Sequence, residues 1–290
     1  DPSDNEDDQP DNSLGSGVIV SEQGLILTND HVIASADEIE VALADGRKLS
    51  AKVVGTDPDS VLAILNVDAE NLPAITFSAS EKLNVGDVVL AIGNPFGVGQ
   101  TVTQGIISAL GRNHLGINTY ENFIQTDASI NPGNSGGALI DTEGNLIGVN
   151  SAIYSRNGGS MGIGFAIPAN IAKQVMEQIV ATGSVTRGWV GIEAQDITPE
   201  LAESFKLPQA RGSLIAGVLK NSPADVAGIK AGDVLLAIND NEIADSSNML
   251  NLIAALKPND QAVLKVARAE KEIKINVTVG TRPKPVVAKE

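Results

Sequence analysis

Between Leu14 and about Gly183, short apolar runs alternate with polar residues and glycines. These runs predict strands at residues 18–20, 25–27, 88–92, 101–107 and 146–152, because short apolar runs bounded by turn residues are typical of buried strands. Alternating apolar positions on both sides of Asp45-Gly46 predict a hairpin. No long helical pattern separates the strands, so the pattern favours a sandwich or barrel over an α/β sheet.

One helical stripe follows these strands. The predicted helix begins near Pro168 and ends at Gly183, and its apolar residues recur at helical spacing: Ile171, Val175, Met176, Ile179 and Val180. A proline near the start of a helix and a glycine after its end are typical signals. Residues 14–186 are therefore predicted to form a mainly β domain with a terminal helix.

The pattern changes to a compact α+β module at residues 187–280. Ser222-Pro223 opens a short predicted helix that ends near Gly228, and residues 234–238 form an apolar strand. Residues 249–256 carry apolar side chains at i, i+3, i+4 and i+7, which predicts a second helix. Clean alternation over residues 273–279 predicts the last strand. Residues 281–290 form a polar tail.

Composition narrows the possible chemistry. Residues 1–13 contain six acidic residues and no aliphatic side chain, so we expect an acidic disordered linker. The abrupt acidic start without Met leads us to expect a membrane anchor or signal upstream. The 20 basic and 36 acidic residues give a net charge of −16, which disfavours nucleic acid as a partner. With no cysteine and two histidines, disulfides, thiol nucleophiles and nearly all zinc sites are excluded.

The segment 131–137, Asn-Pro-Gly-Asn-Ser-Gly-Gly, is the strongest candidate for chemistry. A nucleophilic serine needs an exposed hydroxyl on a tight turn, with backbone N–H groups directed at the oxyanion that develops. Glycines beside Ser135 allow that conformation. The alternative reading is a glycine-rich hairpin with no chemical role.

His31 is the candidate general base. It follows the predicted strand 25–27 and precedes Ser135 by about a hundred residues, which is the chain order of the chymotrypsin arrangement. The other histidine, His114, lies in a polar loop. A histidine beside an apolar pair is otherwise more often a packed core residue.

Together these motifs resemble a known family. TNDHV at 28–32, GNSGG at 133–137, GIGFAIP at 162–168 and WVGI at 189–192 are similar to the HtrA/Deg serine proteases with one C-terminal PDZ domain. GIISA at 105–109 and RGW at 187–189 resemble the DegS/AlgW regulatory branch. The resemblance implies a chymotrypsin-like double β-barrel at 14–186 followed by a PDZ domain at 187–280.

The resemblance also implies catalytic roles, residue by residue. Ser135 matches the nucleophile and His31 the general base, and the N–H groups of Gly133 and Ser135 match the oxyanion hole. Ile130 and Ile163 match positions near the S1 pocket, where their bulk suits a small aliphatic P1 side chain. The mechanism requires neither a cofactor nor a metal ion.

The regulatory residues are implied in the same way. Arg112 matches the family's sensor-loop arginine, which on its own would be read as a solvated loop charge. Val190, Gly191 and Ile192 match the loop that binds a peptide's terminal carboxylate while the peptide adds a strand. The alternative reading of this loop is an ordinary strand start.

The family resemblance further implies partners and location. It suggests a homotrimer in the bacterial periplasm, anchored to the inner membrane by an N-terminal segment missing here. It also suggests an envelope-stress protease, activated by C-terminal peptides of misfolded outer-membrane proteins, that cleaves a transmembrane regulator of the anti-sigma factor type.

The sequence departs from the family at one position. The family's catalytic aspartate lies in a D-L-A-x-L segment, and here the matching residue is Val61. Valine cannot accept the histidine's Nδ1–H, although its shape is close to that of aspartate. On an extended strand Asp59 would face the same side but lie about 6.6 Å away, and Asp57 farther still.

Two hypotheses remain. In the first, the chain is a serine endopeptidase impaired by Val61. In the second, it is a non-catalytic, chaperone-like protein that binds peptides in the PDZ groove.

Overall fold

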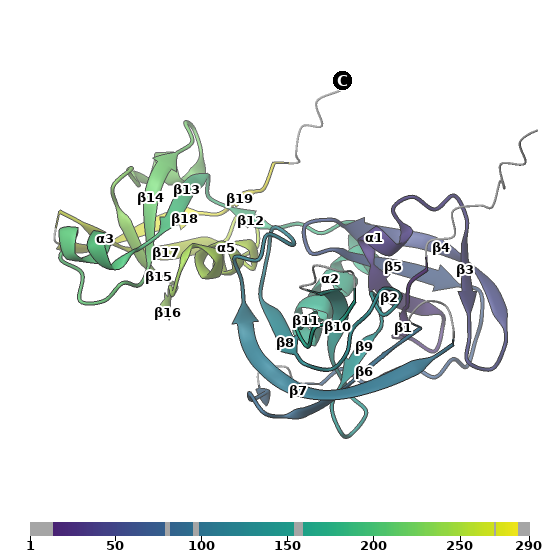
Figure 1. Ribbon diagram of the computed structural model, residues 1–290. Helices are drawn as coiled ribbons and strands as arrows, with labels where there is room; N and C mark the ends of the chain where they lie inside the picture. Colours follow the sequence, from purple (N-terminus) through teal and green to yellow (C-terminus); the bar gives the residue numbers. More distant parts are fainter. Residues whose placement is uncertain (1–13, 79–81, 95–98, 154–158, 270, 284–290) are drawn as a thin grey trace, which may run out of the picture. The chain divides into compact units, whose positions relative to one another are not determined.

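The computed structural model describes residues 14–78, 82–94, 99–153, 159–269 and 271–283. The chain divides into two compact units, Asp1–Val185 and Thr186–Glu290. Figure 1 shows the elements of both units. The predicted linker 1–13 and residues 284–290 of the predicted tail lie outside the described residues.

The first unit begins with a five-stranded antiparallel sheet in the order β1-β2-β5-β4-β3. Its strands are β1 (Val18–Ile19), β2 (Leu25–Asn29), β3 (Ile39–Ala42), β4 (Lys48–Asp57) and β5 (Leu62–Val67). The predicted hairpin joins β3 to β4, and the Leu43 N–H donates to the Arg47 carbonyl across it at 2.8 Å. The hairpin prediction is therefore confirmed.

The second part of this unit is a closed six-stranded barrel in the order β10-β11-β8-β7-β6-β9. Its strands are β6 (Val88–Gly93), β7 (Thr101–Arg112), β8 (Phe123–Thr126), β9 (Ala138–Ile140), β10 (Leu146–Ile153) and β11 (Gly164–Pro168). β7 is longer than predicted, since its pairing with β8 continues to Arg112 and Phe123.

Two helices complete the first unit. The short α1 (Asp30–Ile33) follows β2 directly, and α2 (Ala169–Thr182) is the predicted terminal helix. Gly183 ends α2 in the left-handed conformation (φ 77°), which its lack of a Cβ permits, and its N–H donates to the Ile179 carbonyl. α2 packs against β4 and β5 of the sheet as well as β10 and β11 of the barrel.

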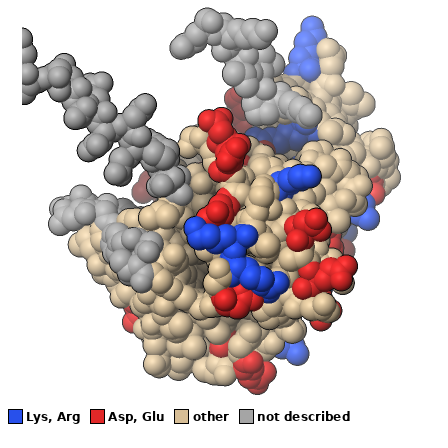
Figure 2. All heavy atoms as spheres, turned by 90° about the vertical axis from the view of Figure 1, so that its right-hand side faces the viewer, with Lys and Arg blue, Asp and Glu red and all other residues tan. Residues whose placement is uncertain are grey.

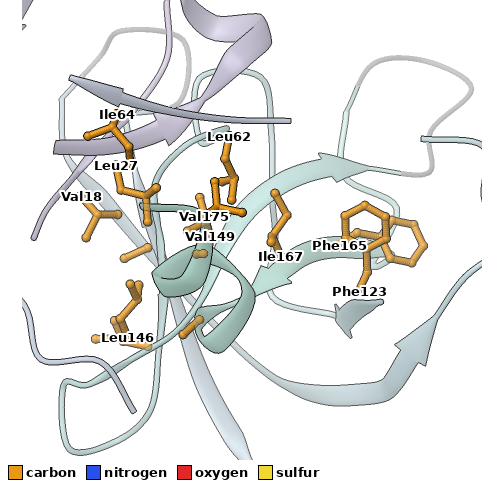
Figure 3. Close-up of a cluster of buried hydrophobic side chains, with 14 of the residues drawn as sticks. Val18, Leu27, Leu62, Ile64, Phe123, Leu146, Val149, Phe165, Ile167 and Val175 are labelled. Atoms are coloured by element: carbon orange, nitrogen blue, oxygen red, sulfur yellow. The ribbon is translucent and has the colours of Figure 1, made fainter. Parts of the chain in front are cut away.

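A hydrophobic cluster therefore joins the sheet, the barrel and α2. Figure 3 shows its side chains converging from all three. Burial of these large aliphatic and aromatic groups is the main force that holds the two β parts together. Its largest fully buried members are Leu27, Leu62, Ile64, Phe123, Leu146 and Ile179.

The second unit is the predicted α+β module. Its strands and helices are β12 (Gly188–Trp189), β13 (Ile192–Asp196), α3 (Pro199–Ser204), β14 (Ser213–Val218), α4 (Pro223–Ala227), β15 (Val234–Ile238), β16 (Asn241–Glu242), α5 (Ser246–Ala254), β17 (Gln261–Arg268), β18 (Lys271–Thr278) and β19 (Gly280–Thr281). The main sheet has the order β13-β14-β15-β17-β18, so β13 is an edge strand. α5 begins three residues before the predicted stripe because the Asp245 carboxylate caps it, accepting from the Asn248 N–H at 2.7 Å.

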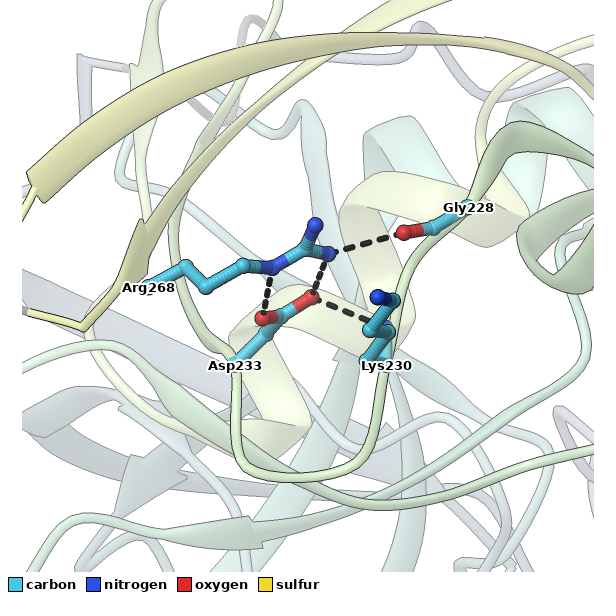
Figure 4. A network of polar contacts seen from close by, with 4 residues as sticks. All are labelled: Gly228, Lys230, Asp233 and Arg268. Carbon is cyan, nitrogen blue, oxygen red and sulfur yellow. Dashed lines mark hydrogen bonds and ion pairs between the residues drawn. The ribbon is translucent and has the colours of Figure 1, made fainter.

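A bidentate ion pair fixes one corner of this unit (Figure 4). Arg268 at the end of β17 donates to both oxygens of Asp233, at 2.7 and 2.6 Å, and to the Gly228 carbonyl after α4 at 2.8 Å. Asp233 also accepts from the Lys230 N–H at 2.9 Å. The Asp233 side chain is only 2% exposed, so the carboxylate of this pair is shielded from water, whereas Arg268 is 32% exposed.

Surface charge is mixed on the face shown in Figure 2, where basic side chains lie among acidic ones. The exposed pair Lys48–Glu40, at 2.8 Å, is of the kind that contributes little to stability. Among the described residues, no helix has both the length and the apolar character needed to cross a membrane.

Candidate active site

The predicted nucleophile lies on a turn at the edge of the barrel. The Asn134 N–H donates to the Asn131 carbonyl at 2.9 Å, with Pro132 and Gly133 (φ 98°) between them. Proline followed by a glycine of positive φ is the sequence of a type II turn. Among the described residues, the N–H groups of Gly133 and Ser135 have no hydrogen-bond acceptor, so both are available to bind an oxyanion.

Ser135 is partly exposed, and its hydroxyl donates to the Ser151 carbonyl at 3.3 Å. This bond is long and weak, so little energy is required to redirect the proton. Ser151 lies on β10, and its own hydroxyl is buried without a partner among the described residues.

His31 lies in the first turn of α1. Its side chain is exposed, and its ring makes no hydrogen bond to any of the described residues. Desolvation by the surrounding protein lowers the pKa of His31 below its usual 6.5, and the neighbouring Asp30 carboxylate offsets only part of this effect. The imidazole is therefore neutral at pH 7, as a general base must be.

Burial raises the pKa of the Asp30 carboxyl, and nearby Asp57 adds to this effect. A hydrogen bond with Thr56 and the charge of His31 act in the opposite direction. Asp30 is thus a partly buried acid beside the predicted base. The sequence motifs did not identify it as a candidate site residue.

Val61 is bonded to the start of α1. Its carbonyl accepts from the Asp30 N–H at 3.1 Å and from the Asn29 side chain at 3.0 Å. Position 61 and the helix that carries His31 are therefore held together through two hydrogen bonds. Val61 itself has φ 58°, in the left-handed region that a β-branched residue rarely adopts.

The sequence-based expectation of an extended strand around Asp59 is wrong, because this residue lies in a turn. β4 ends at Asp57, β5 begins at Leu62, and the two residues pair across a turn of residues 58–61. Asp57 is buried, and its carboxylate accepts a hydrogen bond from the Ser60 hydroxyl. That bond engages Asp57 inside the turn itself, which the linear spacing could not reveal.

The Ser135 turn packs against the β2–α1 junction. A Cβ added to Gly136 (φ 83°) would lie 2.2 Å from the Ser16 carbonyl oxygen, 2.3 Å from Thr28 Oγ1 and 3.1 Å from the Asn29 nitrogen. Only glycine fits so close an approach. Gly136 thereby places the residue after Ser135 against the strand end that leads into His31, so the fold brings the predicted serine, histidine and position 61 to one region.

The two predicted S1 residues have different surroundings. Ile130 is fully buried in a barrel cluster, and a Cβ on Gly164 would lie 2.8 Å from its Cδ1 atom. Ile163 is partly buried and packs against the cluster that includes α2. Ile130 is therefore a core residue of the barrel.

Arg112 is the last residue of β7 rather than a loop residue. Its Nε donates to Gln125 Oε1 on β8 at 2.7 Å, and its side chain is exposed. The loop that follows is ordered by Glu121, a buried carboxylate that accepts from the N–H groups of Leu115 and Ile117, each at 2.6 Å. Glu121 was missed because nothing in its local sequence indicates burial.

The predicted carboxylate-binding loop leads into the edge strand β13. Gly191 has φ 78°, and its carbonyl accepts from the Leu219 N–H at 2.9 Å and from the Ser222 hydroxyl at 3.3 Å. Val190 is buried, and its carbonyl accepts from the Ala224 N–H at 2.9 Å. Within the described part of the chain, the Gly191 N–H donates no hydrogen bond. Ile192 is the first residue of β13, which lies against α5.

Comparison with known proteins places both units in families. Residues 15–149 match the trypsin-like peptidase domain and residues 188–279 the PDZ domain. A probable periplasmic serine endoprotease, DegP-like, from Hahella chejuensis is 51% identical over 271 residues, 93% of this chain and 58% of that protein. A protein of the same name from Chlamydia trachomatis is 50% identical over 275 residues, 95% of this chain and 55% of its own length. The chain thus spans less than two thirds of the length of these curated relatives.

Solved structures agree. The HtrA-type protease AlgW with a decapeptide is 54% identical, with a TM-score of 0.83 over 94% of this chain and 84% of that one. The serine endoprotease from Yersinia pestis is 41% identical, with a TM-score of 0.71 over 93% of this chain and 89% of that one. The mainly β protease domain followed by a PDZ domain is therefore confirmed, and the chain belongs to the HtrA-type serine proteases.

Proposed function

We propose that this chain is a serine endopeptidase of the bacterial envelope whose turnover is limited by Val61. The observation that carries the proposal is the turn at Ser135, with two free N–H groups among the described residues, packed against the junction that holds His31. Acyl transfer needs a nucleophile, a base and an oxyanion site in this arrangement.

The proposed reaction proceeds in two stages. Ser135 Oγ attacks the scissile carbonyl and passes its proton to His31, while the N–H groups of Gly133 and Ser135 bind the oxyanion. His31 returns the proton to the leaving amine, which leaves an acyl-enzyme. Water, deprotonated by His31, then releases the acyl group and regenerates Ser135.

Val61 weakens both stages. A carboxylate at this position would accept the Nδ1–H of His31, fix its tautomer and stabilise the imidazolium. Valine offers no acceptor, and desolvation already disfavours the charged ring. In well-studied serine proteases, asparagine in place of this aspartate lowers kcat by about 10⁴.

Specificity and regulation follow from the rest of the site. We propose that the bulk of the buried Ile130 and the partly buried Ile163 leaves room for only a small aliphatic P1 side chain. Val190, Gly191 and Ile192 bind a C-terminal carboxylate as the peptide pairs with the edge strand β13. The AlgW structures, which are named with a decapeptide or a tripeptide, support peptide binding here.

The biological setting is proposed by analogy. The relatives are named periplasmic, which supports a periplasmic location. We propose a homotrimer tethered to the inner membrane, in which C-terminal peptides of misfolded outer-membrane proteins bind the PDZ domain. Arg112 then relays occupancy to the Ser135 turn, and the substrate is a transmembrane regulator of the anti-sigma factor type.

The test combines covalent labelling of Ser135 with the substitution Val61→Asp, which places a carboxylate at position 61. A fluorophosphonate should label the chain slowly at Ser135, and Val61→Asp should accelerate both labelling and peptide cleavage. Ser135→Ala should abolish both, which shows that the signal comes from this serine. Equal cleavage rates for the original chain and Val61→Asp would contradict the proposed limitation.

The second candidate function is peptide binding without cleavage. It is favoured specifically by Val61, which removes one catalytic group while the PDZ loop retains, within the described residues, a free N–H at Gly191. It predicts tight binding of C-terminal peptides and no labelling of Ser135, even in Val61→Asp. Cleavage by Val61→Asp would exclude it.

A further inference from the structure

Ser16 lies between the two halves of the protease domain and uses every polar group that it has. Its N–H donates to the Ser135 carbonyl at 2.8 Å, and its hydroxyl donates to the Gly133 carbonyl at 2.6 Å. The same hydroxyl accepts from the Asn94 N–H at 2.8 Å, and the Ser16 carbonyl accepts from Thr28 Oγ1 at 2.7 Å. Such complete use of a partly exposed serine exceeds what packing alone requires.

The two donated bonds fall on either side of the Ser135 N–H, one of the two proposed oxyanion donors. The Gly133 carbonyl belongs to the peptide before Asn134, and the Ser135 carbonyl belongs to the peptide after Ser135. Between them lies the peptide that carries the Ser135 N–H. Fixing both neighbours fixes that peptide, in a turn where glycines at 133, 136 and 137 would otherwise permit rotation.

The remaining bonds tie the same turn to the base. Thr28 is 2% exposed on β2, three residues before His31, and its hydroxyl reaches Ser16. Asn94, which also bonds to Ser16, follows β6 of the barrel. A displacement of Ser16 would thus move the oxyanion donors relative to His31.

We propose that Ser16 is a positioning residue for acyl transfer, one that holds the oxyanion turn against the strand leading to His31. The inference rests on the proposed function, because it assigns Ser16 a role in that reaction. Oxyanion donors are effective only within about 2.7–3.1 Å of the developing charge, so a small rotation of the turn lowers kcat without weakening substrate binding.

The kinetic test uses the Val61→Asp chain as parent. Ser16→Ala should lower kcat about 10- to 100-fold, as the loss of an oxyanion donor does, and leave KM nearly unchanged. Phosphonylation of Ser135 should slow by a similar factor. Ser21→Ala removes a hydroxyl that, among the described residues, bonds only the neighbouring Gln23, so this variant should behave as the parent. An unchanged kcat, or a change confined to KM, would overturn the proposal.

If Ser16→Ala does not fold, two variants of Thr28 test the positioning role of Ser16 instead. Thr28→Val keeps the side-chain shape but removes the bond to Ser16, and Thr28→Ser keeps the hydroxyl. The valine variant should lose kcat and the serine variant should retain most of it. Equal rates for the two would count against the proposal.

A third readout does not depend on proteolysis. Amide hydrogen exchange of residues 131–137 should be faster in Ser16→Ala than in Ser21→Ala, both made in the original Val61 chain. If Val61→Asp fails to cleave, the proposed function fails, and this measurement still judges the role of Ser16. Equal exchange in the two variants would refute it.

Discussion

Val61 has an unusual backbone conformation. Its φ of 58° lies in the left-handed region, which aspartate and asparagine adopt far more readily than valine. The turn of residues 58–61, between the paired ends of β4 and β5, imposes this conformation. Val61 is therefore poorly suited to this backbone conformation, and its side chain also lacks the acceptor that a catalytic carboxylate would offer to His31.

Replacing Val61 with asparagine should stabilise the protein. Asn relieves the β-branched strain without adding a charge near Asp57, so the free energy of unfolding should rise by about 1 kcal/mol. Chemical denaturation measures it. The matched control is Val53→Asn on the extended, exposed part of β4, where lower strand propensity should reduce stability slightly. A loss of stability at both positions would contradict the strain at Val61.

The titration of His31 tests the electrostatics of the base. Because desolvation lowers the pKa of His31, its NMR titration midpoint should lie below 6.5. Asp30→Asn removes the charge that opposes this effect, so the midpoint should fall further. Asp37→Asn, an exposed carboxylate in the next loop, should leave it unchanged.

The lowered pKa of His31 also determines the direction in which folding stability changes with pH. Between the folded pKa and 6.5 the unfolded chain binds more protons at His31 than the folded chain does. The contribution of His31 to stability is thus fully present above about pH 6.5 and is lost as the pH falls toward the folded value. A titration midpoint above 6.5 would reverse the sign of this pH dependence.

At the scale of elements, one ion pair holds the end of β17 to the start of β15 and the end of α4. Arg268→Ala would leave the buried Asp233 carboxylate without its bidentate partner, which should lower the free energy of unfolding of the PDZ unit by about 2 kcal/mol. Thermal or chemical denaturation measures this loss. Within the described part of the chain, Arg211→Ala breaks only an exposed pair with Glu242 at 3.6 Å, so it should have little effect. Equal losses in the two variants would contradict the role of burial.

The loop before β13 should be equally sensitive. A Cβ at Gly191 would lie 2.3 Å from Ser222 Cβ, so Gly191→Ala must displace the loop and should weaken binding of a hydrophobic C-terminal peptide about tenfold or more. Fluorescence anisotropy of a labelled peptide measures it. Gly232→Ala has a similar positive φ (91°) but open space around it, so it controls for backbone strain alone. Equal affinities in the two variants would argue against this loop as the carboxylate site.

The elements divide into those that local sequence predicts and those that it does not. The β3–β4 hairpin and α2 carry complete local signals, from Asp45-Gly46 and from Pro168 to Gly183. β8, β9 and β11 are three to five residues long and form only because the closed barrel supplies partners on both sides. Such strands depend on contacts far along the chain, which a local pattern cannot contain.

The same distinction applies to the proposed site. Ser135 and His31 could be proposed from the sequence because nucleophilic chemistry restricts the residue types and the glycine-rich turn is distinctive. Ser16 and Glu121 act through hydrogen bonds to backbone groups, and neither has an unusual local sequence. The conformation at Val61 depends on the closure of a turn between two strands, so the sequence alone could identify the missing carboxylate but not the strain.

At the scale of the whole molecule, the chain combines two units with separate hydrophobic cores. One contains the proposed hydrolytic site and the other the proposed peptide site. We propose that the two are coupled: peptide binding at β13 acts on the Ser135 turn through Arg112, and the output is restricted by the residue at position 61. Allosteric coupling of this kind requires that occupancy of one site changes the rate at the other.

The most informative measurement is cleavage of an unfolded protein substrate by the original chain and by Val61→Asp, each with and without a hydrophobic C-terminal peptide. We expect Val61→Asp to cleave about 10²- to 10⁴-fold faster and the peptide to stimulate it further. If neither chain cleaves while both bind the peptide, the proposed endopeptidase function is wrong and peptide binding is the function.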